Sequence, residues 1–235
     1  MIKVVLFDLD GTLLPMDQEE FMKAYMGTMA KKLAPHGYAP EKLAPVVWNG
    51  VKAMVMNDGT RTNEEAFWDT FCEVFGENAR EDAPIFEDYY RNEFQTVKNS
   101  CGYDAKAKQI VTKLKEKGYR VVLATNPLFP SIATESRIKW AGLEPSDFEL
   151  FTTYENYHYC KPNPKYYFEI LEKLGVEPKD CMMIGNDVTE DMMTKSLGMQ
   201  VFLLTGSLIN KENKDISEYP HGDFCDLVTY IDEQL

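Results

Sequence analysis

The chain has 235 residues, of which 44% are hydrophobic, so it is long enough to bury one large core or a core with an inserted domain. Acidic residues outnumber basic residues by 38 to 25, which gives a net charge of -13. A surface with this charge repels nucleic acids and anionic lipids, so we expect neither a nucleic acid nor a membrane as a partner.

The five cysteines form no CxxC pair and no cluster with histidine at the spacing of zinc ligands, so we expect free thiols. The N-terminal residues lack the basic segment, long apolar stretch and cleavage site of a signal peptide. No apolar run reaches the roughly 18 residues that would span a bilayer. These features together predict a cytoplasmic protein.

The first predicted element is a strand at residues 3–9, with the sequence KVVLFDL. The next segment, residues 16–102, has apolar positions at helical spacing and no convincing strand. A direct crossover between parallel strands needs only about a dozen residues. The longer segment therefore predicts a helical domain inserted after Asp10. We expect Trp48 and Trp68 to pack inside this domain rather than to line a ligand site.

From residue 103 onward, short apolar runs alternate with stretches of helical spacing, and three of these stretches end in glycine after basic residues. This alternation predicts a doubly wound, Rossmann-like α/β core with a parallel sheet, formed by residues 1–15 and 103–235. The predicted strands are 119–125, 148–153, 181–186 and 200–205, and the predicted helices are 105–118, 131–142, 165–175 and 189–198.

Chemically active side chains follow these strands at their carboxyl ends, where open α/β sheets bind ligands. They are Asp8 and Asp10 after the first strand, Thr125 and Asn126 after the second, Lys161 shortly after the third, and Asn186 and Asp187 after the fourth. Three carboxylates around one point repel one another unless a cation joins them. Oxygen ligands of this kind favour Mg²⁺, which usually takes only one or two carboxylates and keeps several waters.

Four motifs occur in order along the chain: FDLDGTLL, LATN, KPNP and IGNDVTED. In order and spacing they resemble the haloacid dehalogenase-like hydrolase superfamily, and the resemblance covers residues 1–15 and about 105–235. The segment 16–102 has the position of the helical cap that this family inserts between its first and second motifs. The resemblance therefore implies an α/β hydrolase core with a helical cap.

The resemblance also implies roles for individual residues. Asp8 would be the nucleophile that forms an aspartyl-phosphate, and Asp10 would protonate the leaving oxygen and then deprotonate the attacking water. Lys161 would neutralise both Asp8 and the phosphate. The implied Mg²⁺ ligands are Asp8, the backbone carbonyl of Asp10, and Asp187, and the implied phosphate-binding residues are Gly11, Thr125, Asn126 and Lys161.

The fourth motif departs from the commoner family pattern, which has the metal-binding aspartate directly after glycine. Here Asn186 stands between Gly185 and Asp187. The spacing from Asp187 to Asp191 still matches the family's DxxxD. We therefore assign Asp187 to the metal and give Asp191 a supporting role on Lys161 or on a metal-bound water.

The sequence thus predicts a Mg²⁺-dependent phosphatase for a small phosphorylated metabolite, acting as a monomer or homodimer. The presence of Asp10 favours phosphate chemistry, because haloacid dehalogenases lack this second aspartate. Lys165 is the alternative if Lys161 is not the active lysine, and the three histidines match no motif. A sugar phosphomutase of the same family remains open, as does a non-catalytic phospho-acceptor or binding protein.

Overall fold

The computed structural model describes residues 2–235, and its centre is a parallel sheet with the strand order β2-β1-β3-β4-β5. The strands are β1 (Val4–Phe7), β2 (Arg120–Leu123), β3 (Cys181–Gly185), β4 (Gln200–Leu204) and β5 (His221–Gly222). Strand β1 pairs in parallel with β2 on one side and with β3 on the other. The carboxyl ends of these three strands therefore meet at one edge of the sheet.

Helices cover both faces of the sheet, and the central strands β1 and β3 are buried along their whole length. In β1, Val5 and Phe7 belong to one hydrophobic cluster, whereas Val4 and Leu6 belong to another. The first cluster contains side chains of α5 (Ala105–Glu116), α6 (Ser131–Trp140) and α8 (Phe224–Gln234), and the second contains side chains of α7 (Pro164–Leu174) and the 3-10 helix η6 (Met192–Leu197). This arrangement confirms the prediction of a doubly wound α/β core.

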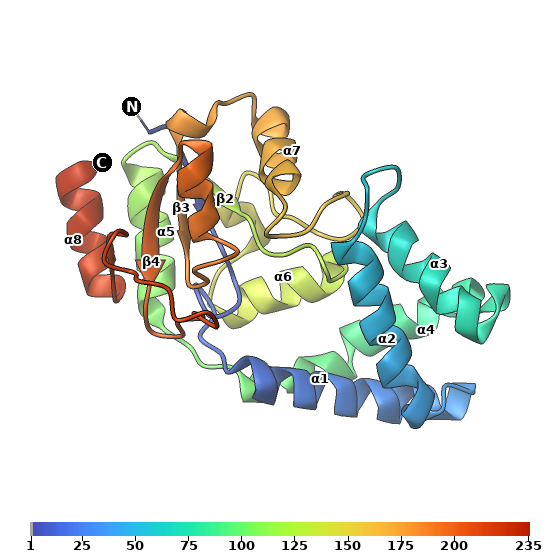
Figure 1. The fold of residues 1–235 in the computed structure, drawn as a ribbon. Coiled ribbons are helices and arrows are strands. Elements are labelled where there is room, and N and C mark those ends of the chain that lie inside the picture. Colours follow the sequence, from blue (N-terminus) through green and yellow to red (C-terminus); the bar gives the residue numbers. More distant parts are fainter. Residues whose placement is uncertain (1) are drawn as a thin grey trace.

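The chain between β1 and α5 is helical, and Figure 1 shows its helices together on one side of the core. The α-helices are α1 (Gln18–Leu33), α2 (Pro40–Val55), α3 (Asn63–Phe75) and α4 (Ala83–Arg91), and the 3-10 helices are η1 (Ala34–His36), η2 (Glu77–Asp82) and η3 (Glu93–Ser100). Met16 forms an antiparallel bridge with Cys101, so the segments that enter and leave this cap lie side by side. The helical insertion is confirmed, and its division at residues 16–102 stays a prediction.

The predicted strand at 148–153 is wrong. This segment forms a single parallel bridge, between Phe151 and Leu123. Beyond the bridge, Tyr154 N–H donates to the carbonyl of Phe129, which lies in the loop after β2. Residues 149–152 therefore lie beside β2, but their pairing with it is too short to form a strand. The short 3-10 helix η4 (Pro145–Asp147) precedes it.

The predicted helix at 189–198 is also shorter than expected. Only Met192–Leu197 is helical, and it is a 3-10 helix. The side chain of Asp187 accepts hydrogen bonds from the N–H groups of Thr189 and Glu190. These bonds hold residues 187–190 in a turn, so the helix starts later. Another 3-10 helix, η5 (Pro178–Asp180), leads into β3.

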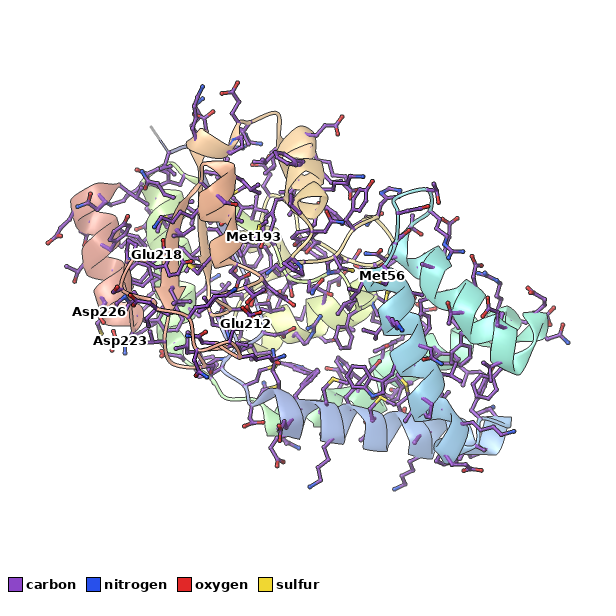
Figure 2. All side chains as sticks on the ribbon, in the orientation of Figure 1. Met56, Met193, Glu212, Glu218, Asp223 and Asp226 are labelled. Atoms are coloured by element: carbon purple, nitrogen blue, oxygen red, sulfur yellow. The ribbon has the colours of Figure 1, made fainter. Side chains whose placement is uncertain are left out.

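Several surface carboxylates have structural partners away from the cap. Figure 2 shows Glu218, Asp223 and Asp226 near β4 and α8, whereas Met56 lies at the end of α2. Asp223 and Asp226 form a capping box at the start of α8, and Glu218 pairs with Lys195. In the part of the chain that the structure describes, no helix combines the length and apolar character that a membrane crossing requires.

Candidate active site

The turn after β1 places Asp8 and Asp10 at the edge of the sheet. Asp8 N–H continues the β-ladder by donating to the carbonyl of Ile184 at 2.9 Å. At Gly11 the chain turns with a φ of +84°, and a Cβ there would lie 2.3 Å from Nδ2 of Asn186. Both the positive φ and this close approach require glycine. The DxDG sequence therefore gives a tight turn packed against the end of β3.

Lys161 joins two of the predicted residues. Its Nζ donates to Oδ1 of Asp8 at 2.8 Å and to Oδ1 of Asp191 at 2.6 Å. Although burial alone would lower the pKa of Lys161, the carboxylates of Asp191 and Asp8 raise it well above its usual range. Lys161 is therefore a buried cation between two acids. The alternative, Lys165, is exposed and lies over the ring of Tyr159.

Asp191 is buried and also fixes the backbone at the end of β3. Its Oδ2 accepts the N–H groups of Asn186 and Asp187 at 3.1 and 3.0 Å. A Cβ at Gly185 would lie 2.1 Å from this oxygen, so only glycine permits the contact. Burial raises the pKa of Asp191, and the charge of Lys161 opposes the rise. Asp191 thus holds Lys161 on one side and the fourth motif on the other.

Asp10 has a partner that the sequence did not reveal, Arg137 of α6. The Arg137 side chain is fully buried and forms an ion pair with Oδ2 of Asp10. Its guanidinium also lies 4.3 Å from the ring centroid of Phe129. Burial raises the pKa of Asp10, and Arg137 opposes part of this rise. Oδ1 of Asp10 is buried, and no group within residues 2–235 forms a hydrogen bond with it.

The side chains of Asn186 and Asp187 have different surroundings. The amide of Asn186 accepts the hydroxyl hydrogen bond of Thr12 at 3.0 Å and donates to the carbonyl of Ser207 at 2.7 Å. Oδ1 of Asp187 accepts two backbone N–H groups, whereas its Oδ2 accepts no hydrogen bond within the described residues 2–235. Asp187 therefore has an oxygen available for a ligand. Thr12, whose hydroxyl also lies 3.2 Å from Oδ2 of Asp8, could have been found from the DxDGT motif.

The end of β2 contributes Thr125 and Asn126. The Thr125 carbonyl accepts a hydrogen bond from the Tyr166 hydroxyl at 2.8 Å, which fixes the buried residue in place. Oδ1 of Asn126 accepts the backbone N–H of Lys161 at 3.2 Å. Its Nδ2 donates to Glu190, a further acid that the sequence analysis did not single out. Burial raises the pKa of Glu190 to about 7.

These side chains meet at a cavity of roughly 360 Å³ between the strand ends and the cap. Asp8, Asp10, Thr125, Asn126 and Asp187 all line it, together with Asn186, Glu190 and Asp191. Lys161 and Arg137 lie behind the carboxylates, as their near-complete burial shows. No histidine is among the described residues that line the cavity.

The expectation for Trp48 is wrong. Trp48 is 51% exposed and lines the cavity, because α2 turns this position toward the catalytic core rather than toward the other cap helices. Trp68 packs in the cap as expected, against Phe71 and Phe86, but it also lines the cavity. The helical spacing of apolar residues did not distinguish positions that pack between the cap helices from positions that line the cavity.

The charges at this site leave an excess of carboxylates. Five acids line the cavity, namely Asp8, Asp10, Asp187, Glu190 and Asp191, and they outnumber the nearby cations, which are the buried Lys161 and Arg137 and the exposed Lys211. Among residues 2–235, no group of three or more His, Cys, Asp or Glu side chains is arranged to hold a metal. The Mg²⁺ ligands predicted from the sequence are fewer, namely the side chains of Asp8 and Asp187 and the backbone carbonyl of Asp10. Such a set fits Mg²⁺, which completes its octahedron with water.

The haloacid dehalogenase-like hydrolase family model matches residues 2–198. The chain belongs to this family. The predicted family is therefore confirmed, and the protein is a hydrolase. Phosphoglycolate phosphatase from Aquifex aeolicus is 23% identical over 235 residues, which cover 100% of this chain and 99% of that protein. Pyrophosphatase PpaX from Bacillus cereus is 23% identical over 79% of this chain and 75% of its own length.

Among solved structures, L-2-haloacid dehalogenase from Xanthobacter autotrophicus has a TM-score of 0.60 and 14% identity, with 100% of both chains covered. At this identity the likeness shows the fold. The relatives' names differ in substrate, so they do not specify which compound this hydrolase acts on.

Proposed function

We propose that this hydrolase is a Mg²⁺-dependent phosphatase that cleaves a small-molecule phosphomonoester through an aspartyl-phosphate on Asp8. One observation carries the proposal: the two acids after β1 have separate cationic partners and line the same cavity. Asp8 is paired with Lys161, and Asp10 is paired with Arg137. Two acids in different surroundings are suited to two different steps.

In the first step, a carboxylate oxygen of Asp8 attacks phosphorus and the bond from phosphorus to the alcohol oxygen breaks. Lys161 lies 2.8 Å from Asp8 and neutralises charge on the nucleophile. Thr125 and the backbone N–H groups near Gly11 and Asn126 are the donors proposed for the phosphoryl oxygens.

Mg²⁺ bound by Asp8, the Asp10 carbonyl and Asp187 would supply positive charge to the phosphoryl group. The excess of carboxylates supports this assignment, because a phosphate dianion would otherwise enter a site with net negative charge. The free Oδ2 of Asp187 supports the choice of Asp187 over Asn186.

Asp10 is proposed as the general acid and base. Two observations support this role: Oδ1 of Asp10 forms no hydrogen bond within the described residues, and the Asp10 residue lines the cavity. Asp10 gives a proton to the departing alcohol oxygen and later takes one from the water that attacks phosphorus. The phosphorus bond to Asp8 then breaks, which restores the Asp8 carboxylate and the protonated Asp10 and releases phosphate.

The test is phosphate release from 4-nitrophenyl phosphate by the wild-type protein and by Asp8→Asn. Turnover that disappears in Asp8→Asn supports the proposal, whereas equal turnover in both proteins contradicts it. A phosphomutase would isomerise a sugar phosphate without net phosphate release, so the same measurement with sugar phosphates separates that alternative. A binding protein would show no turnover with any ester.

A further inference from the structure

The part of the cavity formed by the cap is almost entirely apolar. Four methionines and several aromatic rings line it, and Gln18 is the sole cap side chain there with an amide or a charge among the described residues. The cap residues in the lining are Met16, Gln18, Phe21, Met22, Tyr25, Met29, Val47, Trp48, Val51, Met54, Phe67, Trp68, Phe86 and Tyr90. The leaving group of a bound phosphate ester would lie against this surface, since the acids occupy the opposite side.

The cavity offers little to an anionic leaving group. Of the described residues that line it, Lys211 alone is cationic, and its side chain is exposed in the loop after β4. A carboxylate or a second phosphate in the cap half would therefore be buried without a cationic partner, which is costly. The carboxylates at the opposite side add repulsion.

Sugar hydroxyls would also find few partners. The hydroxyls of Tyr25 and Tyr90 lie 2.8 Å apart and hydrogen bond to each other. The Tyr25 ring in turn meets Phe129 edge to face, with centroids 5.3 Å apart. This packing uses one of the two hydroxyl protons within the pair, and both tyrosines line the cavity.

We propose that the alcohol part of the substrate is an uncharged hydrophobic group that carries a ring. The proposal rests on the phosphatase function above and names its substrate class. Apolar and aromatic walls with a few polar groups at one end are typical of small-molecule sites, and about 360 Å³ is near the lower limit of their size. Methionine side chains adapt to ring edges, which suits this ligand class.

The first experiment compares 3-phenylpropyl phosphate with phosphoglycolate and with glucose 6-phosphate. All three esters leave as primary alkoxides, so differences in rate report mainly on the cavity. We expect kcat/KM for 3-phenylpropyl phosphate to exceed that for the other two by at least about 100-fold, the size of discrimination that apolar pockets achieve. Equal values, or a preference for phosphoglycolate or the sugar phosphate, overturn the proposal.

The second experiment changes the cap. Trp48→Ala is expected to raise KM for 3-phenylpropyl phosphate about tenfold or more, with a smaller effect on kcat. Met56→Ala is the matched control. Met56 follows the last residue of α2, the helix that contains Trp48, but it is 73% exposed and does not line the cavity. An equal effect of the two substitutions contradicts the inference.

A third variant tests the charge argument directly. Val51 is half-buried on α2 and lines the cavity. Val51→Lys adds a cation there, and we expect it to improve kcat/KM for phosphoglycolate while it lowers that for 3-phenylpropyl phosphate. If the variant remains folded but lowers kcat/KM equally for both esters, the charge argument is contradicted.

Binding without turnover separates the two proposals. Binding of 3-phenylpropanol to Asp8→Asn can be followed by tryptophan fluorescence, because Trp48 and Trp68 line the cavity. Binding of this alcohol together with no hydrolysis of any ester by the wild type would reject the phosphatase function alone. Hydrolysis of several esters without selective binding of the ring-bearing alcohol would reject the substrate class alone.

Discussion

Arg137 and Asp10 form an ion pair across 127 residues of sequence, with the arginine fully buried on α6. This pair holds one oxygen of Asp10, whereas the other oxygen, Oδ1, is buried and has no hydrogen-bond partner in the described residues. Asp8, two residues earlier, is held by Lys161 instead. Each acid of the DxD motif therefore has its own cation, from a different part of the core.

Replacement of this arginine tests the ion pair. Arg137→Met leaves the carboxylate of Asp10 largely buried without a cation, so we expect the free energy of unfolding to fall by about 3–5 kcal/mol. Urea unfolding at neutral pH measures the change. The double variant Arg137→Met with Asp10→Asn removes both charges, so its free energy of unfolding should be higher than that of Arg137→Met alone.

The control for this experiment is Lys139→Met on the same helix. Lys139 is exposed, so this substitution should change stability by no more than about 0.5 kcal/mol. If Arg137→Met is as stable as Lys139→Met, the ion pair with Asp10 does not stabilise the fold.

The core and the main acids could be predicted from sequence because each depends on a short local pattern. Apolar runs gave β1, β2, β3 and β4, and the DxDGT and KPNP motifs gave Asp8, Asp10 and Lys161. Each of these signals lies within a few neighbouring residues.

Arg137 was missed because its partner is distant in sequence. One local signal could have identified it: Arg137 lies four residues after Ala133 on the buried face of α6, where a charged residue needs a partner. Trp48 was misplaced for a similar reason, since helical spacing shows that a face is apolar but not what it faces. The segment 148–153 is apolar enough for a strand and forms backbone hydrogen bonds with Val121 and Leu123, but Tyr154 bonds to Phe129 in the loop after β2, so the pairing ends at a single bridge.

The turn after β1 gives a second prediction. Gly11→Ala would place a Cβ 2.3 Å from Asn186 and would force alanine to adopt a φ of +84°. We expect a loss of about 1–3 kcal/mol in unfolding free energy from the conformation alone, and reduced turnover because Asp10 would shift.

The matched control is Gly27→Ala in α1. Apart from its chain neighbours and the backbone of its own helix, nothing lies within 4 Å of a Cβ at Gly27, so this change should stabilise the protein by about 0.5–1 kcal/mol. Thermal unfolding compares the two variants. If both substitutions shift the stability in the same direction, the conclusion that the turn requires glycine at position 11 is contradicted.

A third prediction concerns the metal. Chelation should abolish turnover, and added Mg²⁺ should restore it. Asp187→Asn should raise the Mg²⁺ concentration needed for half-maximal activity by at least about tenfold, since even partners of metal ligands affect affinity by 10–100-fold. Asn186→Ala removes hydrogen bonds to Thr12 and Ser207, so it should lower stability while the Mg²⁺ requirement stays the same. The opposite pattern would assign the metal to Asn186, and full activity in excess chelator would reject the metal altogether.

The last prediction separates Asp8 from Asp10 by the step that each serves. Asp8→Asn removes the nucleophile, so no covalent intermediate forms and turnover should vanish. Asp10→Asn retains the nucleophile but loses the proton donor and the later base. General acid–base catalysis typically contributes about 10²–10⁴-fold, so this variant should be slow rather than inactive.

The decrease in rate caused by Asp10→Asn should depend on the leaving group of the ester. An aryl phosphate leaves as a stabilised phenolate that needs little protonation, so transfer to Asp8 should persist. Hydrolysis of the aspartyl-phosphate still needs a base to activate water, so the intermediate should accumulate. Intact-mass measurement after mixing Asp10→Asn with an aryl phosphate should therefore show one added phosphoryl group, and an alkyl phosphate should label the protein more slowly. If Asp8→Asn becomes labelled and Asp10→Asn does not, the two roles are reversed.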